Sequence, residues 1–339
     1  MAGSISRRAI LGGGVTLGAA ALVARGLPAS AGVLTNGKPG SGGPMKRVYG
    51  PALVGTTFDL LPFQPKINDY SAAVAGWNKT TGTTMRCWKV YYQASKFPTK
   101  LDPKLTAIIG QGIQAMISFK PAPPSSKSQA HKDYQALQNA IQMLSSARVN
   151  GKKLRAEVCL WQEIGPKDMK PDQYHDLVAF YARLIRPHYP LVYDAPGYPG
   201  LPVWKAYRPD DSLLDGYALD FYCGDYLHDP TALDQFMPLA GKKPVGIWEI
   251  GNTASSKFAP SPADIRNYMT YITTTLSKRL LSGLPVGNVA WYNGPATPSQ
   301  NGANEIVGTH PYKYASTDIY YYRKLYEAIN GKFPKSVTA

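Results

Sequence analysis

The chain contains few of the residues that bind metals, form disulfides or span membranes. Its 339 residues include three cysteines and five histidines, with no Cys-x-x-Cys pair and no two histidines at the spacing of metal ligands. After residue 35, no apolar run reaches the roughly 18 residues that a membrane-spanning helix needs. We therefore expect no metal, no cofactor and no membrane-spanning segment in the mature protein.

The first 31 residues have the features of an export signal. Paired arginines, Arg7 and Arg8, precede a modest apolar stretch from Ile10 to Val23, and Ala29-Ser30-Ala31 offers a small-residue cleavage site. This pattern resembles a bacterial twin-arginine signal, the alternative being an arginine-rich helix start in the first domain. We expect residues 1–31 to be removed and the mature protein to work outside the cytoplasm.

Positive charge is in excess. The net charge is +15, and removal of residues 1–31 takes away three arginines and no acid, which leaves +12. Such a charge favours anionic partners, among them acidic polysaccharides. The basic residues are scattered, however, and no helix-turn-helix, zinc-finger or RNA-binding signature accompanies them. We expect a solvated basic surface, no nucleic-acid partner and a monomer.

The cysteines are Cys87, Cys159 and Cys223, and their odd number leaves at least one free thiol. Each falls within or just after a run that predicts a strand. A cysteine in that setting usually serves as a small buried apolar side chain. We therefore interpret all three as structural.

Residues 51–335 keep one uniform pattern, which indicates a single domain, whereas the glycine- and proline-rich residues 32–50 predict a flexible lead-in. Within the domain, short apolar or β-branched runs alternate with stretches of helical periodicity, clearest over residues 132–147, 171–185 and 262–281. The runs predict eight strands, over residues 53–57, 84–91, 114–119, 155–161, 190–194, 214–220, 244–248 and 288–292.

Strands that alternate with helices predict a parallel sheet, and eight repeats predict its closure into a (β/α)8 barrel. An open doubly wound sheet is the alternative, but no glycine-rich phosphate loop follows the first run. In the fifth unit, residues 196–202 contain three prolines and two glycines. That stretch predicts a long surface loop in place of a helix.

Two of the predicted strands deliver a glutamate at their C-terminal ends, which is where a (β/α)8 barrel carries its active site. Glu163 follows the fourth strand and Glu249 the seventh, and each is followed by Ile-Gly. Facing carboxylates suit the cleavage of a glycosidic bond, because one donates a proton to the leaving oxygen while the other attacks the anomeric carbon or activates water. Either glutamate alone would be interpreted as a salt-bridging or solvent-facing residue, but the pair predicts catalysis.

Four segments carry a family resemblance. Residues 243–251 fit the pattern Lys-Pro-x-x-x-x-Glu-x-Gly, and Gln162-Glu163-Ile164-Gly165 is similar to His-Glu-x-x-Gly. Residues 207–222 follow a Tyr-x-Pro-Gly-Asp-like turn and then Val-Asp-x-x-x-x-Asp-x-Tyr, and residues 117–121 are similar to a Ser-aromatic-x-Pro strand end. In this order and spacing, over most of residues 110–295, they resemble family 26 of the clan A glycoside hydrolases, the β-mannanase-like enzymes.

The resemblance implies a retaining double displacement with Glu163 as acid/base and Glu249 as nucleophile. It also implies that Tyr222 holds the nucleophile by a hydrogen bond, and Asp220 of the same motif is a further candidate for substrate binding. The family's histidine on strand four, which helps to bind sugar near the cleaved bond, is replaced by Gln162. The resemblance therefore does not extend to β-mannan as the substrate.

Sugar sites need flat apolar faces surrounded by hydrogen-bonding groups. Trp291, beside Tyr292 and Asn293 on the eighth strand, is the strongest candidate for a stacking platform, with core packing as the alternative. Further aromatic candidates near strand ends are Trp88, Trp161 and Trp248, of which Trp248 is more consistent with core packing. The cationic candidates are Arg86, Lys89 and Lys120, which could bind sugar hydroxyls or acidic substituents or have a plain structural role.

Two hypotheses of function follow. The first is an exported retaining glycosidase that acts on a neutral or anionic polysaccharide or oligosaccharide. The second is a non-catalytic carbohydrate- or cell-wall-binding protein on the same barrel, which the change at Gln162 and the basic surface favour. A basic nuclease is a third interpretation, but the chain lacks the histidine and acidic metal cluster that it would need.

Overall fold

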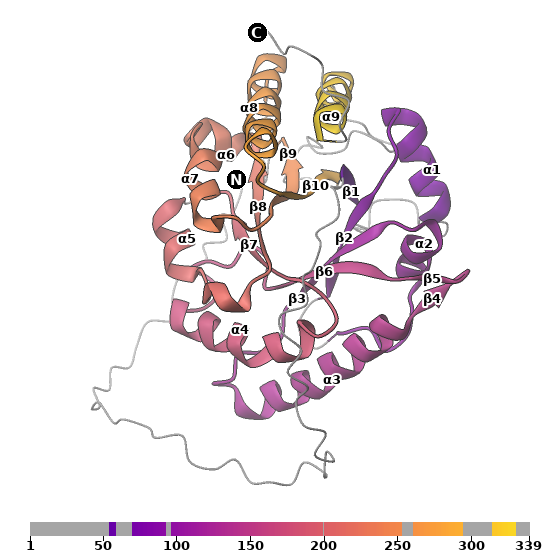
Figure 1. Ribbon diagram of the computed structural model, residues 1–339, viewed down its shortest axis with the longest axis vertical. Coiled ribbons are helices and arrows are strands. Elements are labelled where there is room, and N and C mark those ends of the chain that lie inside the picture. The colour runs from indigo at the N-terminus through magenta and orange to yellow at the C-terminus, as the bar shows by residue number, and fades with distance from the viewer. Residues whose placement is uncertain are drawn as a thin grey trace, which may run out of the picture. The chain divides into compact units, whose positions relative to one another are not determined.

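Parallel strands close into a barrel in the computed structural model, which describes residues 54–58, 70–92, 96–198, 200–252, 260–293 and 314–329. The order around the barrel is β1-β2-β3-β6-β7-β8-β9-β10, and β10 pairs with β1 to close it. The predicted (β/α)8 barrel is confirmed (Figure 1). The barrel strands are β1 (Val54–Phe58), β2 (Cys87–Tyr92), β3 (Gln114–Phe119), β6 (Arg155–Leu160), β7 (Leu191–Pro196), β8 (Gly216–Tyr222), β9 (Val245–Gly251) and β10 (Val286–Asn293).

The predicted export signal and lead-in, residues 1–31 and 32–50, lie outside the described residues. Each of the eight predicted runs falls on one barrel strand, and the third run coincides with β3. A short antiparallel hairpin, β4 (Arg148–Val149) and β5 (Lys152–Lys153), stands apart from the barrel and turns through Asn150 and Gly151, which both have positive φ.

Helices surround the barrel (Figure 1). They are α1 (Tyr70–Thr81), α2 (Pro103–Gln111), α3 (Lys127–Ser146), α4 (Pro171–Ile185), α5 (Leu201–Tyr207), α6 (Cys223–His228), α7 (Ala232–Phe236), α8 (Pro262–Leu281) and α9 (Ala315–Ile329), with 3-10 turns η1 (Asp211–Leu213) and η2 (Met237–Ala240). None of the helices within the described part of the chain is long and apolar enough to cross a bilayer.

Local sequence explains where the long helices begin. Helix α8 starts at a capping box, in which Ser261 Oγ accepts from the Asp264 N–H at 3.2 Å and the Ser261 N–H donates to Asp264 Oδ2 at 2.9 Å. Pro262 occupies the first turn, where its missing N–H costs nothing. Helices α4 and α8 span the predicted ranges.

The prediction of a long loop in the fifth unit was wrong. Helix α5 forms directly after the proline- and glycine-rich stretch, and Pro202 lies in its first turn. Trp204 of this helix is fully buried, and its Nε1 donates to the Pro196 carbonyl at 2.6 Å. Tertiary burial of this tryptophan thus outweighs the weak helical tendency of the preceding residues.

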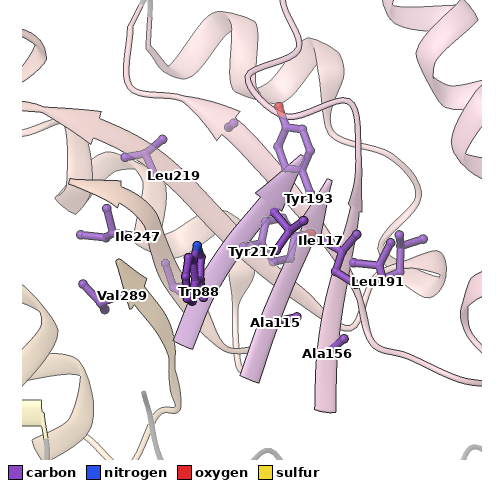
Figure 2. Packing of buried hydrophobic residues seen from close by; sticks show 14 of the residues in the cluster. Trp88, Ala115, Ile117, Ala156, Leu191, Tyr193, Tyr217, Leu219, Ile247 and Val289 are labelled. Atoms are coloured by element: carbon purple, nitrogen blue, oxygen red, sulfur yellow. The ribbon is translucent and has the colours of Figure 1, made fainter. Parts of the chain in front are cut away.

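Side chains on the barrel strands alternate between two apolar clusters, as the period of a strand requires. One lies inside the barrel and comprises Cys87, Met116, Cys159, Val192, Ala218, Trp248 and Ala290. The other lies between the barrel and its helices and includes Trp88, Ala115, Ile117, Leu191, Leu219, Ile247 and Val289, which Figure 2 shows together. All three cysteines are buried and free, which agrees with a structural role.

Strand β9 departs from this alternation near its C-terminal end. Leu219 pairs with Ile247, but Asp220 pairs with Glu249, so β9 contains one residue more than β8 over this interval. Such a bulge changes the side to which the following residues point. Trp248 lies in the interior cluster, and Glu249, the next residue, points to the same interior, where its carboxylate meets the Lys89 ammonium.

Candidate active site

The C-terminal ends of the barrel strands gather a dense set of ionisable side chains. They come from strands far apart in the sequence, and the two predicted catalytic glutamates are among them. The set comprises Lys89 and Tyr91 on β2, Lys120 after β3, Glu163 after β6, Asp194 on β7, Asp220 and Tyr222 on β8, and Glu249 on β9.

Lys89 lies at the centre of this set and has no exposed surface. Its Nζ lies 3.0 Å from Asp194 Oδ2, 2.8 Å from Asp220 Oδ2 and 2.8 Å from Glu249 Oε1. Burial alone would lower the pKa of this lysine, but the three carboxylates outweigh burial and raise the pKa well above its usual value. The ammonium therefore stays charged and connects β2 to three consecutive strands.

Glu249 accepts hydrogen bonds from three donors. Tyr91 Oη donates to Oε1, which also meets Lys89, and Tyr222 Oη donates to Oε2. Burial and the negative charge of Glu249 raise the pKa values of both tyrosines well above the usual range, so both remain protonated donors. Donors on both oxygens favour the ionised carboxylate. Only 4% of Glu249 is exposed.

Glu163 has the opposite environment. Burial and the neighbouring charge of Glu249 raise its pKa to about 7, although Lys89 and Lys120 act in the other direction. The carboxyl group of Glu163 is therefore protonated below neutral pH, while Glu249 is surrounded by donors that stabilise its charge. Two nearby carboxyl groups whose environments differ in this way form an acid and base pair.

The backbone that presents Glu163 has an unusual conformation. Trp161 and Glu163 have φ values of 57° and 51°, in the left-handed region that side chains other than glycine rarely adopt. Two hydrogen bonds hold this turn, from the Trp161 N–H to the Phe119 carbonyl at 2.9 Å and from the Glu163 N–H to the Asp194 carbonyl at 3.2 Å. Strain of this kind, about 1–3 kcal/mol per residue, is typical of functional sites.

Three further predicted residues lie at the same strand ends. Trp161 Nε1 donates to the Pro121 carbonyl at 2.7 Å, and Lys120 Nζ lies 5.6 Å from the centre of the Trp161 ring. Gln162 Oε1 is buried and accepts no hydrogen bond. These residues therefore place an aromatic ring, a cation and an unsatisfied acceptor beside Glu163.

The prediction that Trp291 offers a stacking face was wrong. Its side chain has no exposed surface and belongs to the cluster between the barrel and the helices. Trp88 lies in the same cluster (Figure 2) and is fully buried. The ring of Tyr70 on α1 lies 6.0 Å from the Trp88 ring, measured between ring centres. Both tryptophans stand on strands whose alternate residues face the interior, and each falls on the outward-facing side.

Arg86 was also misplaced. It is exposed and precedes β2, so it lies at the N-terminal end of the barrel strands, away from the glutamates. The predicted strand, residues 84–91, starts three residues before β2 does. Asn293 ends β10, and its side chain lies outside the described residues.

Tyr91 and Asp194 were not predicted as site residues, and Lys89 was not distinguished from Arg86 and Lys120 as a candidate. A signal was present for each. Lys89 and Tyr91 follow Cys87 at intervals of two residues, so all three share one face of β2. Asp194 ended the fifth predicted run, in the position that singled out the glutamates on other strands.

Within the residues that the structure describes, no group of three or more histidine, cysteine, aspartate or glutamate side chains is arranged to hold a metal ion. The carboxylates at the strand ends converge instead on the ammonium of Lys89.

Comparison with known proteins supports the fold. No family model matches the sequence, and no curated protein matches it either. Among solved structures, an engineered protein has a TM-score of 0.55 at 10% identity, over 81% of this chain and 69% of that chain. A β-glucuronidase from Ruminococcus gnavus has a TM-score of 0.52 at 10% identity, over 80% of this chain and 50% of that one. A β-1,4-mannanase of family 113 has a TM-score of 0.48 at 12% identity, over 83% and 99%.

The class of protein that these observations define is the (β/α)8 barrel with its ionisable residues at the C-terminal ends of the strands. Glycoside hydrolases of families 113, 26 and 5 are among the matching structures. At identities of 9–13% the likeness shows the fold alone.

Proposed function

We propose that this protein is a glycoside hydrolase that cleaves a polysaccharide or oligosaccharide with retention of configuration. One observation carries the proposal: Glu249 is held by three donors that favour its charged form, while the pKa of Glu163, beside it, is raised to about 7. A glycosidase needs one carboxylate and one carboxylic acid at the same bond, and these environments supply both.

In the first step Glu163 donates its proton to the glycosidic oxygen, and the leaving sugar departs as an alcohol. A Glu249 oxygen attacks the anomeric carbon, and a glycosyl ester forms. In the second step Glu163, now ionised, takes a proton from water. The resulting oxygen nucleophile attacks the same carbon, and Glu249 leaves as a carboxylate.

The donors around Glu249 affect both steps. Tyr91, Tyr222 and Lys89 fix the carboxylate in one orientation, so that little reorganisation is needed before attack. They also stabilise the charge that returns to Glu249 when the ester is hydrolysed, which assists the second step. Tyr222 thereby has the role that the resemblance to family 26 implies.

The test compares Glu249→Gln and Glu163→Gln with the wild type on a panel of neutral and acidic polysaccharides and aryl glycosides. Each variant is expected to lose about a thousandfold or more in kcat/KM on polysaccharide. Glu327→Gln, on the surface of α9, is the matched control and should retain full activity. Hydrolysis that is unchanged in Glu249→Gln would refute the proposal.

Retention has its own readout. A 2-deoxy-2-fluoroglycosyl fluoride is expected to label Glu249 covalently, and NMR of the first product is expected to show the anomer of the substrate. Release of the opposite anomer would contradict the double displacement. Binding of glycans with neither hydrolysis nor labelling would favour the non-catalytic alternative.

The setting of this activity is also a proposal. The twin-arginine pattern of residues 1–31 supports export, and a charge of +12 after removal of the signal favours an acidic glycan over a neutral one. Fractionation of the native host, with detection of the mature N-terminus by mass spectrometry, tests the first point. The glycan panel tests the second.

A further inference from the structure

Lys89 and the three buried carboxyl groups around it do not balance in charge. One ammonium contacts three carboxyl groups, those of Asp194, Asp220 and Glu249, and the exposed fractions of the four residues are 0%, 0%, 0% and 4%. With every group ionised, this cluster would have a net charge of −2, and the ionised form of Glu163 would make it −3. Uncompensated charge in a buried space is costly, and carboxyl groups in that position take up protons instead.

The donors around each carboxyl group indicate where the proton lies. Glu249 has two tyrosine hydroxyls in addition to Lys89, which favour its ionised form. Asp220 meets Lys89 with both oxygens, at 2.9 and 2.8 Å. Asp194 meets Lys89 with Oδ2 alone, and its Oδ1 is buried and accepts no hydrogen bond. The two aspartates are therefore stabilised less than Glu249 as anions.

The two aspartates also lie close together. They stand on adjacent strands, where Pro196, two residues after Asp194, pairs with Asp220. Their carboxyl groups contact the same ammonium, with Asp194 Oδ2 at 3.0 Å and Asp220 Oδ2 at 2.8 Å from Lys89 Nζ. Two ionised carboxylates held at one ammonium repel each other, and a single proton on the pair removes this repulsion.

We infer that Asp194 and Asp220 hold one proton between them, and that the pair positions Lys89 and, through it, Glu249. The pair then carries a single negative charge, which balances the ammonium. The remaining charge of the cluster is that of Glu249, the proposed nucleophile. This inference rests on the proposed function only for its role in catalysis, since the shared proton is a property of the folded protein.

Other ionisable groups face the pair from every neighbouring element. These groups are unchanged in the aspartate variants considered below, so comparison of those variants with the wild type isolates the pair. They are Lys89 and Tyr91 on β2, Cys159 on β6, Glu163 after it, Tyr174 on α4, Tyr193 on β7, Tyr222 on β8 and Glu249 on β9.

Infrared spectroscopy of protein labelled with carboxyl-¹³C aspartate tests the shared proton directly at pH 7. A protonated carboxyl group absorbs at a different infrared frequency from a carboxylate, and the isotope label distinguishes the aspartate bands from the band of Glu163. Asp194→Asn and Asp220→Asn are each expected to remove one protonated aspartate band from the wild-type spectrum. The amide takes the place of the protonated member, so the remaining aspartate is ionised. An unchanged band intensity in both variants overturns the inference.

Asp318 on α9 provides the matched control, because it is fully buried and burial raises its pKa well above the usual value. Asp318→Asn should remove only the band of Asp318 itself and leave the band of the Asp194–Asp220 pair unchanged. Near-ultraviolet circular dichroism of each variant checks that the barrel has folded. A variant that fails this check is replaced by the other aspartate variant, since either one alone tests the pair.

A pH profile of kcat/KM tests the positioning role. The alkaline limb is expected to reflect loss of the Glu163 proton, and a single Asp→Asn change leaves the charge of the pair at −1. The limb should therefore stay within about 0.3 pH unit, whereas the double variant Asp194→Asn/Asp220→Asn should move it about one unit or more to lower pH. A shift of that size already in both single variants would mean that both aspartates are ionised.

Lys89 completes the experiment. Lys89→Met is expected to reduce kcat/KM by about a hundredfold or more, and Lys89→Arg should restore part of the loss, because it returns the cation. No rescue by arginine would contradict a positioning role through charge. Loss of the infrared band without any glycosidase activity would overturn the proposed function and leave the shared proton established, so the two failures are distinguishable.

Discussion

Asp220 and Glu249 are direct partners across β8 and β9, because the register of the two strands shifts by one residue between Leu219 and Asp220. Without the shift, Asp220 would face Trp248, and the Glu249 side chain would point outward to the helices. With it, Glu249 and the preceding Trp248 both point into the barrel. The carboxylate reaches Lys89 only because of this local irregularity.

A glycine makes this arrangement possible. A Cβ atom on Gly246 would lie 2.4 Å from the Asn288 carbonyl oxygen and 3.1 Å from the Asn288 nitrogen, both backbone atoms of β10. No ordinary Cβ approaches an oxygen so closely, so β9 and β10 would have to separate. The close approach of the two strands therefore requires glycine at this position.

Gly246→Ala is expected to lower the free energy of unfolding by about 1–3 kcal/mol, because it forces a backbone displacement in a packed barrel. The variant should also lose activity well below its melting temperature, since Glu249 lies on the displaced strand. Urea denaturation and kcat/KM at 25 °C measure the two effects.

Gly76→Ala is the control. A Cβ atom at this position would meet nothing within 4 Å, and the alanine should stabilise α1 by about 0.5–1 kcal/mol. Equal stability of the two variants would contradict the close approach.

The hydroxyls of Tyr91 and Tyr222 are the second point at which Glu249 depends on its neighbours. Each donates to a different carboxylate oxygen, and a hydrogen bond to a charged group is worth about 1.5–3 kcal/mol. Tyr91→Phe and Tyr222→Phe are each expected to reduce kcat/KM by about 10- to 100-fold, because each variant removes one donor from the carboxylate. Steady-state kinetics would measure the loss.

Tyr189 supplies the matched control for these two variants. Its hydroxyl is buried and makes no hydrogen bond, so Tyr189→Phe removes the same atom without removing a contact. It should leave kcat/KM unchanged. If all three phenylalanine variants behave alike, the two hydroxyls do not act on Glu249.

The sequence was sufficient to predict the barrel and the position of Glu163 and Glu249 at the C-terminal ends of its strands, and the reason is physical. Strand and helix periods are local, and the active site of a barrel lies at one end of its strands, so a carboxylate that ends an apolar run is informative. Which face of a strand points into the barrel cannot be predicted in this way. Trp88 and Trp291 lie outside the barrel, one residue from Lys89 and Tyr292, and only the closed barrel decides which alternate set is interior.

Two features lay beyond such reasoning. The bulge at Trp248 and Glu249 has no signature in the run of apolar residues that contains it. The convergence of Asp194, Asp220 and Glu249 on one ammonium depends on three strands that are adjacent only in the folded barrel. The hairpin at Asn150-Gly151, by contrast, was foreseeable, because that dipeptide is the strongest short-range hairpin signal.

Lys120 gives a prediction of pH dependence. Its positive charge lowers the pKa of Glu163, whereas burial and Glu249 raise it, with a result of about 7. Activity should therefore fall as the pH rises through about 7, because the proposed acid loses its proton. In Lys120→Met the opposing charge is gone, so the pKa of Glu163 rises and the alkaline limb moves to higher pH. The pH dependence of kcat/KM measures the shift.

The control for this variant is Lys278→Met, which removes an exposed lysine of α8 and should leave the limb where it is. A limb that moves to lower pH in Lys120→Met would show that the lysine acts on a different group. A limb that does not move would show that Glu163 is not the acid whose proton controls the activity.

Glu157, at the opposite end of β6, predicts a dependence of stability on pH that is independent of catalysis. Only 7% of it is exposed, and the Asn288 amide donates to Oε2 at 2.7 Å. Burial raises its pKa to about 7, and the hydrogen bonds from Asn288 and Gln114 oppose the rise only in part. The folded protein therefore binds this proton more tightly than the unfolded chain, in which the pKa is about 4.3.

For a raised pKa of this kind, the stabilisation is fully present below the unfolded value and is lost as the pH rises through about 7. Between pH 5 and pH 8 the wild type should lose about 2–3 kcal/mol more of its free energy of unfolding than Glu157→Gln, whose side chain is neutral throughout. Urea denaturation at both pH values measures the difference, with Glu327→Gln on the exposed face of α9 as the control. Because other buried carboxyl groups also lose protons over this range, the decisive quantity is the difference between wild type and variant. Equal losses in the two proteins would mean that Glu157 is already ionised in the folded state at pH 5.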